Sequence, residues 1–386
     1  MKKLATKHYW IKLKNGKRLS FLYFVTVTGF LSSLLLTTDA WSENRTYPLT
    51  PVISNFSLGH TTQNSLFWIF IFTLTISLIS KKYRRTLVSL SLISLVILVL
   101  MDVTRLQPWV FHYGAILFSF SWFLNYKGVT NLNLLDTARI VVGGIYFWSG
   151  VQKINPYFIA YVFPWFTQKI WEPFGETGAT LFVVLGMLVP FIEASFAVGF
   201  FSKKYRSLSI VGATSMIILV LTAIGPLGHN WNSSVWPWNI GIFSMVIVLF
   251  FGAHFSFKEF IKRQRKNFLG IMAFLVFWIM PAGNLIGLTD HYLSWSLYTG
   301  KVPEATMYGN MGLLKSLSNE AEDGSLLFSS WTMSDFNMVP YPEVRVFENV
   351  FKQTCQQFPE QKLKLEISNK DYGFIAKEEI LNYECN

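Results

Sequence analysis

Long apolar runs, separated by short clusters of charged residues, recur along most of this 386-residue chain. Charged residues make up only 14% of the sequence, about half of the roughly 25% that is usual in soluble domains, while hydrophobic residues make up 52%. A bilayer core about 30 Å thick needs roughly 20 mostly apolar residues per helical span. The sequence therefore predicts a polytopic membrane protein whose membrane part is all-α. We expect nine transmembrane helices, at about residues 20–38, 65–80, 86–101, 109–124, 138–152, 179–200, 207–224, 236–254 and 267–289.

The apolar and aromatic stretch 157–171 does not read as a further span. Pro156, Pro164 and Pro173 border or interrupt it. Proline removes a helical hydrogen bond and clashes with the preceding turn, so a straight helix across the bilayer is unfavourable here. We expect an interfacial or re-entrant piece instead.

The distribution of lysine and arginine predicts the orientation. With nine spans, 21 of these residues fall on the side of the N-terminus and only 4 on the other side before the C-terminal tail. Basic residues favour the cytoplasmic side, so we expect a cytoplasmic N-terminus and an outer C-terminus, most naturally in a bacterial inner membrane. The net charge of +11 is then a topology signal rather than a sign of nucleic-acid binding. The first span reads as an uncleaved signal anchor, with a cleaved signal peptide as the alternative.

The composition changes after the membrane domain, residues 1–289. Residues 290–386 hold 8 Lys/Arg against 14 Asp/Glu, and we expect them to form a small extracytoplasmic α+β domain. Short alternating segments at 344–347 and 363–367 predict strands. Cys355 and Cys385, the two cysteines of the chain, lie in this part. They form either a disulfide, which persists outside the cytoplasm, or two free thiols.

Lys153 follows the fifth expected span at its outer border. Gly143, Tyr146, Gly150 and Lys153 are spaced three, four and three residues apart, so they share one helix face. Glycines on that face let a neighbouring helix or a flat ligand approach closely. The lysine is either an anchor that reaches for water or a base kept neutral by apolar surroundings, and the residues alone leave both open.

Two buried charges predict a structural contact elsewhere. If the sixth span begins near residue 179, Glu193 lies about 21 Å below the outer surface. The same arithmetic puts Arg139 at that depth and Lys153 about 21 Å above it. We expect an Arg139–Glu193 ion pair, in preference to a proton relay.

Several polar residues reach the same outer level as Lys153 from other helices. His112, His229, Asp102 and Asp290 are among them, and tryptophans surround them. Together they predict a site for a flat, lipid-soluble molecule, with acid/base groups at one end and aromatic walls around its body. Scattered interfacial anchoring is the alternative. No Cys/His metal spacing or glycine-rich phosphate loop occurs, so we expect neither a metal nor a nucleotide. The residues that we expect to contact the ligand are Tyr146, Gly150, Asn230, Trp236 and Asn239.

Four stretches of the membrane part stand in a characteristic order, namely 146–155, 190–196, 229–244 and 292–300. The first, which contains Lys153, resembles the catalytic-lysine region of the vitamin K-dependent gamma-carboxylases and the wider horizontally transferred transmembrane (HTTM) domain superfamily. The second resembles that family's helix with a single acidic residue, the third its helix start with His and Asn, and the fourth the segment that leaves its last membrane helix. The resemblance covers about residues 100–310.

The resemblance implies a membrane enzyme that uses reduced vitamin K or another lipid quinol. Lys153 would be the general base, with His112 and His229 as supporting catalytic groups. In that family oxygen converts the quinol to an epoxide and generates a strong base, which removes a proton from a peptide glutamate so that carbon dioxide can add. The expected partners are therefore membrane lipid, a lipid quinone and a secreted peptide or protein. Two other classes stay open: a DoxX-like quinone-linked redox subunit, and a non-enzymatic component for export or maturation of a secreted peptide.

Overall fold

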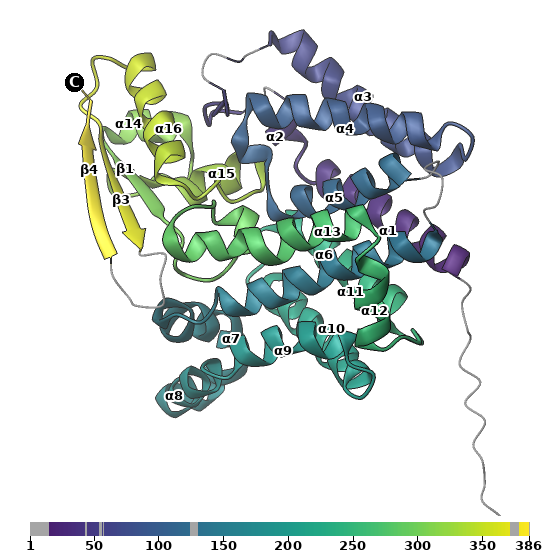
Figure 1. Ribbon diagram of the computed structural model, residues 1–386. Helices are drawn as coiled ribbons and strands as arrows, with labels where there is room; N and C mark the ends of the chain where they lie inside the picture. Colours follow the sequence, from purple (N-terminus) through teal and green to yellow (C-terminus); the bar gives the residue numbers. More distant parts are fainter. Residues whose placement is uncertain are drawn as a thin grey trace, which may run out of the picture.

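The structure is a computed structural model that describes residues 15–42, 45–53, 56, 58–123, 130–370 and 378–385. Residues 1–14, which carry much of the expected N-terminal basic cluster, lie outside the described residues. The described chain is mostly helical, with one small sheet near the C-terminus (Figure 1). The α-helices before the sheet are α1 (Asn15–Leu35), α2 (Thr38–Trp41), α3 (His60–Ile79), α4 (Arg84–Met101), α5 (Pro108–Phe123), α6 (Asn131–Val151), α7 (Phe163–Trp171), α8 (Gly175–Gly186), α9 (Val189–Phe201), α10 (Arg206–Ile224), α11 (Trp236–Phe250), α12 (Phe257–Gln264) and α13 (Phe268–Phe274).

Seven helical stretches within the described residues are long and apolar enough to cross a membrane, which indicates an integral membrane protein. Six of them correspond to expected spans and contain α1, α3, α4, α10, α11 and α13. The seventh, Phe158–Phe201, joins the expected re-entrant piece to the expected sixth span, with a break after Gly186. The expected spans at 109–124 and 138–152 are helices α5 and α6 and are not among the seven. The described part of α5 has 16 residues and is about 24 Å long, and α6 carries Asp136 and Arg139 near its start.

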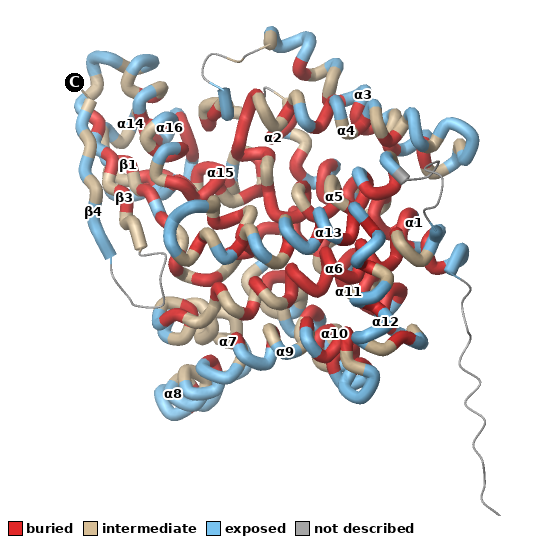
Figure 2. Tube along the Cα trace, in the orientation of Figure 1, coloured by how far each residue is buried: buried red, intermediate tan, exposed pale blue. Residues whose placement is uncertain are grey.

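Helix α6 lies at the centre of the bundle and is buried on nearly all sides (Figure 2). It contacts α1, α5, α9, α11 and α13. By contrast, α8 and much of α3 and α10 present exposed apolar side chains, as helices facing lipid do. A central helix with buried charges needs polar partners. Asp136 accepts hydrogen bonds from Arg139 at 2.5 Å, from Arg263 at 2.6 Å and from Gln264 at 3.2 Å.

The C-terminal region, residues 290–386, contains a four-stranded antiparallel sheet in the order β2-β1-β3-β4. Its strands are β1 (Glu304–Tyr308), β2 (Ser325–Leu327), β3 (Lys364–Lys370) and β4 (Glu378–Glu384). Its helices are α14 (Met311–Leu317), α15 (Phe328–Phe336) and α16 (Val344–Gln357). The strand expected at 363–367 is therefore found as β3, whereas the one expected at 344–347 is wrong. Val346, Phe347, Val350, Phe351 and Thr354 are buried on α16, a spacing that continues as a helical face.

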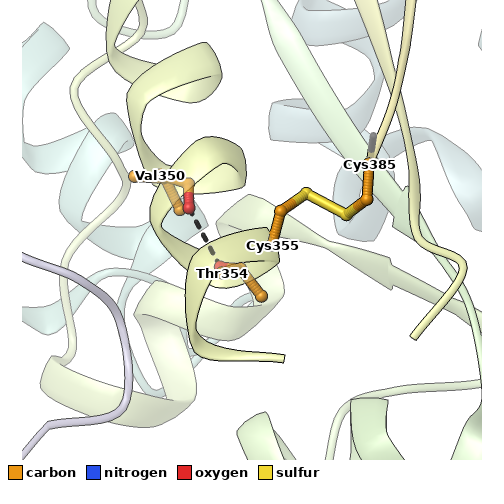
Figure 3. The surroundings of a disulfide bond; sticks show 4 residues. All are labelled: Val350, Thr354, Cys355 and Cys385. Atoms are coloured by element: carbon orange, nitrogen blue, oxygen red, sulfur yellow. Dashed lines mark hydrogen bonds between the residues drawn. A yellow bond between two sulfur atoms is a disulfide. The ribbon is translucent and has the colours of Figure 1, made fainter. Parts of the chain in front are cut away.

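Cys355 on α16 and Cys385 after β4 form a disulfide, with Cα atoms 5.6 Å apart (Figure 3). One residue earlier, the Thr354 hydroxyl donates to the carbonyl of Val350 within α16. The disulfide therefore ties the edge strand of the sheet to the helix that packs on β3.

The C-terminal region is fastened to the rest of the chain by polar contacts. The Asp335 carboxylate accepts from the backbone N–H groups of Thr46 and Tyr47 at 2.8 Å. The Asn337 amide donates to the carbonyl of Leu36 at 3.1 Å, and the Gln353 amide donates to that of Leu49 at 2.8 Å. This region therefore sits at one end of the bundle, opposite the end that carries α12 (Figure 1).

Candidate functional site: a lysine, glutamate and serine cluster

The end of α6 meets the beginning of α9. Helix α6 stops at Val151, and Lys153 lies in the following turn, where its N–H donates to the carbonyl of Gly150 at 3.1 Å. Helix α9 starts at Val189, with Pro190 in its first turn, a position that proline favours because its missing N–H is not needed there. Glu193 consequently lies about one turn into α9.

Three side chains form a closed hydrogen-bonded group, which we call the Lys153 cluster: Lys153, Glu193 and Ser149. The Lys153 amine donates to both carboxylate oxygens of Glu193, at 2.7 and 3.0 Å, and to the Ser149 hydroxyl at 2.9 Å. Ser149 in turn donates to Glu193 at 2.7 Å. The Lys153 and Glu193 side chains are 12% and 7% exposed, so each charge depends on the other for most of its stabilisation.

A glycine allows the two helices to come this close. A Cβ atom on Gly150 would lie 2.5 Å from the backbone nitrogen of Ala194 and 2.6 Å from the carbonyl oxygen of Pro190. Further along both helices, a Cβ atom on Gly143 would lie 2.9 Å from a ring carbon of Phe201. The shared face predicted from the sequence is thus a helix-packing face. The space at Gly150 is filled by the backbone of α9, which leaves no room there for a ligand.

The Arg139–Glu193 ion pair expected from the sequence is wrong. Arg139 pairs with Asp136 at 2.5 Å and donates to the carbonyl of Leu249, while Glu193 pairs with Lys153. The depth estimate failed because residues 179–200 are not one straight span. The break between α8 and α9 moves Glu193 from about four turns to about one turn from a helix start.

The Lys153 cluster lies beside surface that a membrane would cover. Phe191 and Ile192, directly before Glu193, are 59% and 50% exposed. The ring centroid of Phe158 lies 5.9 Å from the Lys153 amine, which adds an aromatic wall. A lipid-soluble molecule could therefore reach the edge of this cluster from the bilayer.

The two histidines expected beside Lys153 have other partners. His112 is fully buried on α5, and its Nδ1 accepts from the indole N–H of Trp238 at 3.0 Å. His229 stacks on Trp165 with ring centroids 4.1 Å apart, and its Nε2 lies 2.7 Å from the Trp165 carbonyl oxygen. Among the described residues, no hydrogen bond or ion pair joins either histidine to Lys153.

The remaining expected contacts are also local. The Tyr146 ring packs edge-on against Phe200, 5.4 Å away, on the face that meets α9. Asn230 is an exposed loop residue with a φ of 49°. Trp236 donates to the carbonyl of Trp231 at 3.2 Å, and Asn239 to that of Val235 at 2.9 Å. The structure therefore brings Tyr146, Gly150 and Lys153 together along one face. Asn230 lies in the loop before α11, and Trp236 and Asn239 lie in the first turns of α11.

The sequence indicated which charged residues are buried, but it did not indicate which residues they contact. Ser149 lies four residues before Lys153 and Asp136 three before Arg139, spacings that place each pair on one helix face and could have been used. Asp102 was expected near Lys153 but belongs to a separate cluster, 2.8 Å from Arg45 and 3.7 Å from Arg105.

The pKa values of Asp102 and Arg105 in this second cluster are both shifted. Burial alone raises the pKa of Asp102, but Arg45, Arg105 and hydrogen bonds from Thr50 and Thr104 outweigh it and leave the pKa below its ordinary value. Burial lowers the pKa of Arg105 to about 10. The cluster fixes the loop after α4 against the segment before α3.

No group of three or more His, Cys, Asp or Glu side chains that could hold a metal ion occurs within the described part of the chain. No protein-family model, no curated protein and no solved structure matches this sequence.

Proposed function

We propose that this protein is an integral membrane enzyme that acts on a lipid quinol beside the Lys153 cluster. In this proposal α5 and α6 also cross the bilayer, which gives nine spans. The N-terminus is cytoplasmic, residues 290–386 form an extracytoplasmic α+β domain, and the host membrane is a bacterial inner membrane. The skewed distribution of basic residues supports this orientation.

The observation that carries the proposal is the ion pair of Lys153 and Glu193 at the lipid-facing edge of the bundle, 2.7 Å long and closed by Ser149. Ionised groups in apolar surroundings are costly, so their presence here favours a function. The resemblance of residues 146–155 to the catalytic-lysine region of the gamma-carboxylases points to the same lysine.

Lys153 can become a neutral base by giving its proton to Glu193, so no other charged group is needed. Transfer of one proton from the Lys153 ammonium to the Glu193 carboxylate, along their hydrogen bond, leaves a neutral amine and a neutral acid. Low dielectric surroundings favour neutral forms over separated charges. The amine can then accept a proton from a quinol hydroxyl. The Ser149 hydroxyl contacts both Lys153 and Glu193 and can keep the two side chains in place during this transfer. The family resemblance suggests two later steps: molecular oxygen, as the oxidant, converts the quinol to an epoxide, and carbon dioxide adds to a peptide glutamate that has lost a proton.

A binding role without turnover is the second candidate. Glu193 neutralises the Lys153 ammonium in place, and a lysine held in this way can donate a hydrogen bond to a quinone oxygen without losing its proton. This corresponds to a DoxX-like quinone-linked subunit.

The test uses the full-length protein in lipid nanodiscs with a reduced naphthoquinone as the probe. Lys153→Ala and Lys153→Arg should both abolish quinol oxidation, because a guanidinium stays protonated and cannot act as a base. Lys169→Ala is the matched control, since Lys169 is an exposed lysine on nearby α7. Full oxidation by Lys153→Arg contradicts the base role. Naphthoquinone that co-purifies with the wild type but not with Lys153→Ala, without turnover in either, supports the binding role.

A further inference from the structure

A long apolar groove lies between α4, α5, α6 and α13, on the side of α6 away from the Lys153 cluster. Its volume is about 600 Å³. Only Ser119, Trp122 and Thr137 among its lining residues carry a polar side-chain atom. Such a groove suits a hydrocarbon chain.

The groove has the length of one lipid leaflet. Its lining residues on α5 run from Val110 to Trp122, which is about 18 Å along the helix axis. Half of a bilayer core is about 15 Å thick. One acyl chain can therefore lie in it from end to end.

One end of the groove adjoins a strongly basic segment. Phe268 and Leu269 line the groove, and Arg265 and Lys266 precede them by only two or three residues. The Cα atom of Lys266 is consequently within about 7 Å of that of Phe268. Both Arg265 and Lys266 are exposed.

Helix α12, directly before this turn, has the surface of a membrane-interface helix. Lys258 and Lys262 are exposed one turn apart and continue the row that Lys266 ends, while Phe257 and Ile261 form an exposed apolar row beside them. Phe260 and Gln264 are buried on the opposite face. Basic and apolar rows side by side are typical of helices that lie among anionic headgroups.

Arg263, two residues before Arg265, adds a cation near this end of the groove without lining it. Its Nε donates to Asp136 at 2.6 Å, and Asp136 immediately precedes Thr137, which lines the groove. Among the described residues, Nη2 of Arg263 is buried without a hydrogen-bond partner. A buried guanidinium N–H without an acceptor is costly, and a phosphate oxygen would satisfy it.

We propose that the groove binds one acyl chain of an anionic phospholipid, whose phosphate lies on Arg263, Arg265 and Lys266. The apolar lining accounts for the chain and the basic end accounts for the headgroup charge. Lys153, in the turn after α6, lies 12 residues beyond the groove residue Val141, which is about 18 Å if measured along the helix axis. The lipid site is therefore independent of the proposed quinol chemistry.

The experiment measures retained lipid in the full-length protein. The protein is reconstituted with phosphatidylglycerol and phosphatidylcholine in equal amounts, extracted in mild detergent, and analysed by native mass spectrometry. The wild type should retain phosphatidylglycerol in preference. Arg265→Gln with Lys266→Gln should reduce that preference about thirtyfold, the effect of two cations near a headgroup. Lys81→Gln with Lys82→Gln removes the same charge from exposed residues of the loop before α4 and should leave it unchanged.

A second variant tests the groove without altering charge. Ala115→Trp places a large ring in the groove and should abolish retention, with an unchanged melting temperature as evidence of folding. Equal retention of both lipids by the wild type, an equal loss in the Lys81/Lys82 control, or undiminished retention in Ala115→Trp each overturns the proposal.

Discussion

Replacing one member of the Lys153–Glu193 pair should destabilise the protein strongly, and replacing both should restore most of the loss. Both side chains are nearly buried, so Lys153→Met leaves an unpaired carboxylate and Glu193→Met an unpaired ammonium. Breaking a buried pair from one side costs about 3–5 kcal/mol. We expect about 3 kcal/mol for each single variant, near the lower limit, because Ser149 still bonds to the remaining charge.

The double variant Lys153→Met/Glu193→Met removes both charges and keeps similar volume. It should lose only about 1 kcal/mol, since apolar replacements of buried pairs are often neutral. The resulting coupling energy is roughly 5 kcal/mol, above the range of about 0.5–3 kcal/mol usual for neighbours, as expected for a mutually dependent pair of charges.

Reversible unfolding in mixed micelles, followed by far-UV circular dichroism, gives the three free-energy differences. Lys169→Met serves as the control, because it removes an exposed lysine of the same type and should change stability by less than about 0.5 kcal/mol. Losses in the double variant that equal the sum of the single losses would show that the two side chains do not stabilise each other. The contact would then have no energetic role.

Three other changes have defined outcomes. Gly150→Ala places a methyl group 2.5 Å from the nitrogen of Ala194, so thermal melting should show a loss of about 1–3 kcal/mol, whereas a neutral result would refute the close helix approach. Cys355→Ser with Cys385→Ser opens a loop of 30 residues and should cost the C-terminal region about 3–4 kcal/mol, seen as faster proteolysis of that region alone. The folded-state pKa of Asp102 is lowered, so its contribution to stability is present above its unfolded pKa of about 3.9 and is lost as pH falls through the folded value. Asp102→Asn should abolish that acid-side loss in a pH series of melting temperatures.

The apolar pattern predicted most of the helices because a bilayer imposes length and composition together. It could not predict where α6 begins. The expected span starts at residue 138, next to Arg139, but the helix begins at Asn131. Asp136 is tolerated inside because Arg139, Arg263 and Gln264 all donate to it, and two of these donors are more than 120 residues away in sequence. Pairing at that separation is invisible to a local pattern.

The contacts of the candidate site could not be predicted either, because they depend on the register between α6 and α9. Residue numbers rise along α6 as they fall along α9: Gly143 faces Phe201, Gly150 faces Ala194 and Lys153 meets Glu193. This antiparallel register sends Arg139 to the opposite end of the interface from Glu193. Sequence spacing could predict the face of α6, but the register depends on where α9 begins. The signal for that beginning was Pro190, which favours the first turn of a helix.

The direction of the Lys153 side chain bears on the choice between an anchor and a base. An anchoring lysine at a helix end extends its amine past the end, toward water. Here the amine points back along α6 to Ser149, four residues earlier, and across to Glu193, and the side chain is 12% exposed. Turning inward gives up hydration that a residue in the turn after the helix could have reached. The two hydrogen bonds to the Glu193 carboxylate offset this loss of hydration. The geometry therefore disfavours the anchoring role, and a paired lysine that exchanges a proton is the interpretation to test.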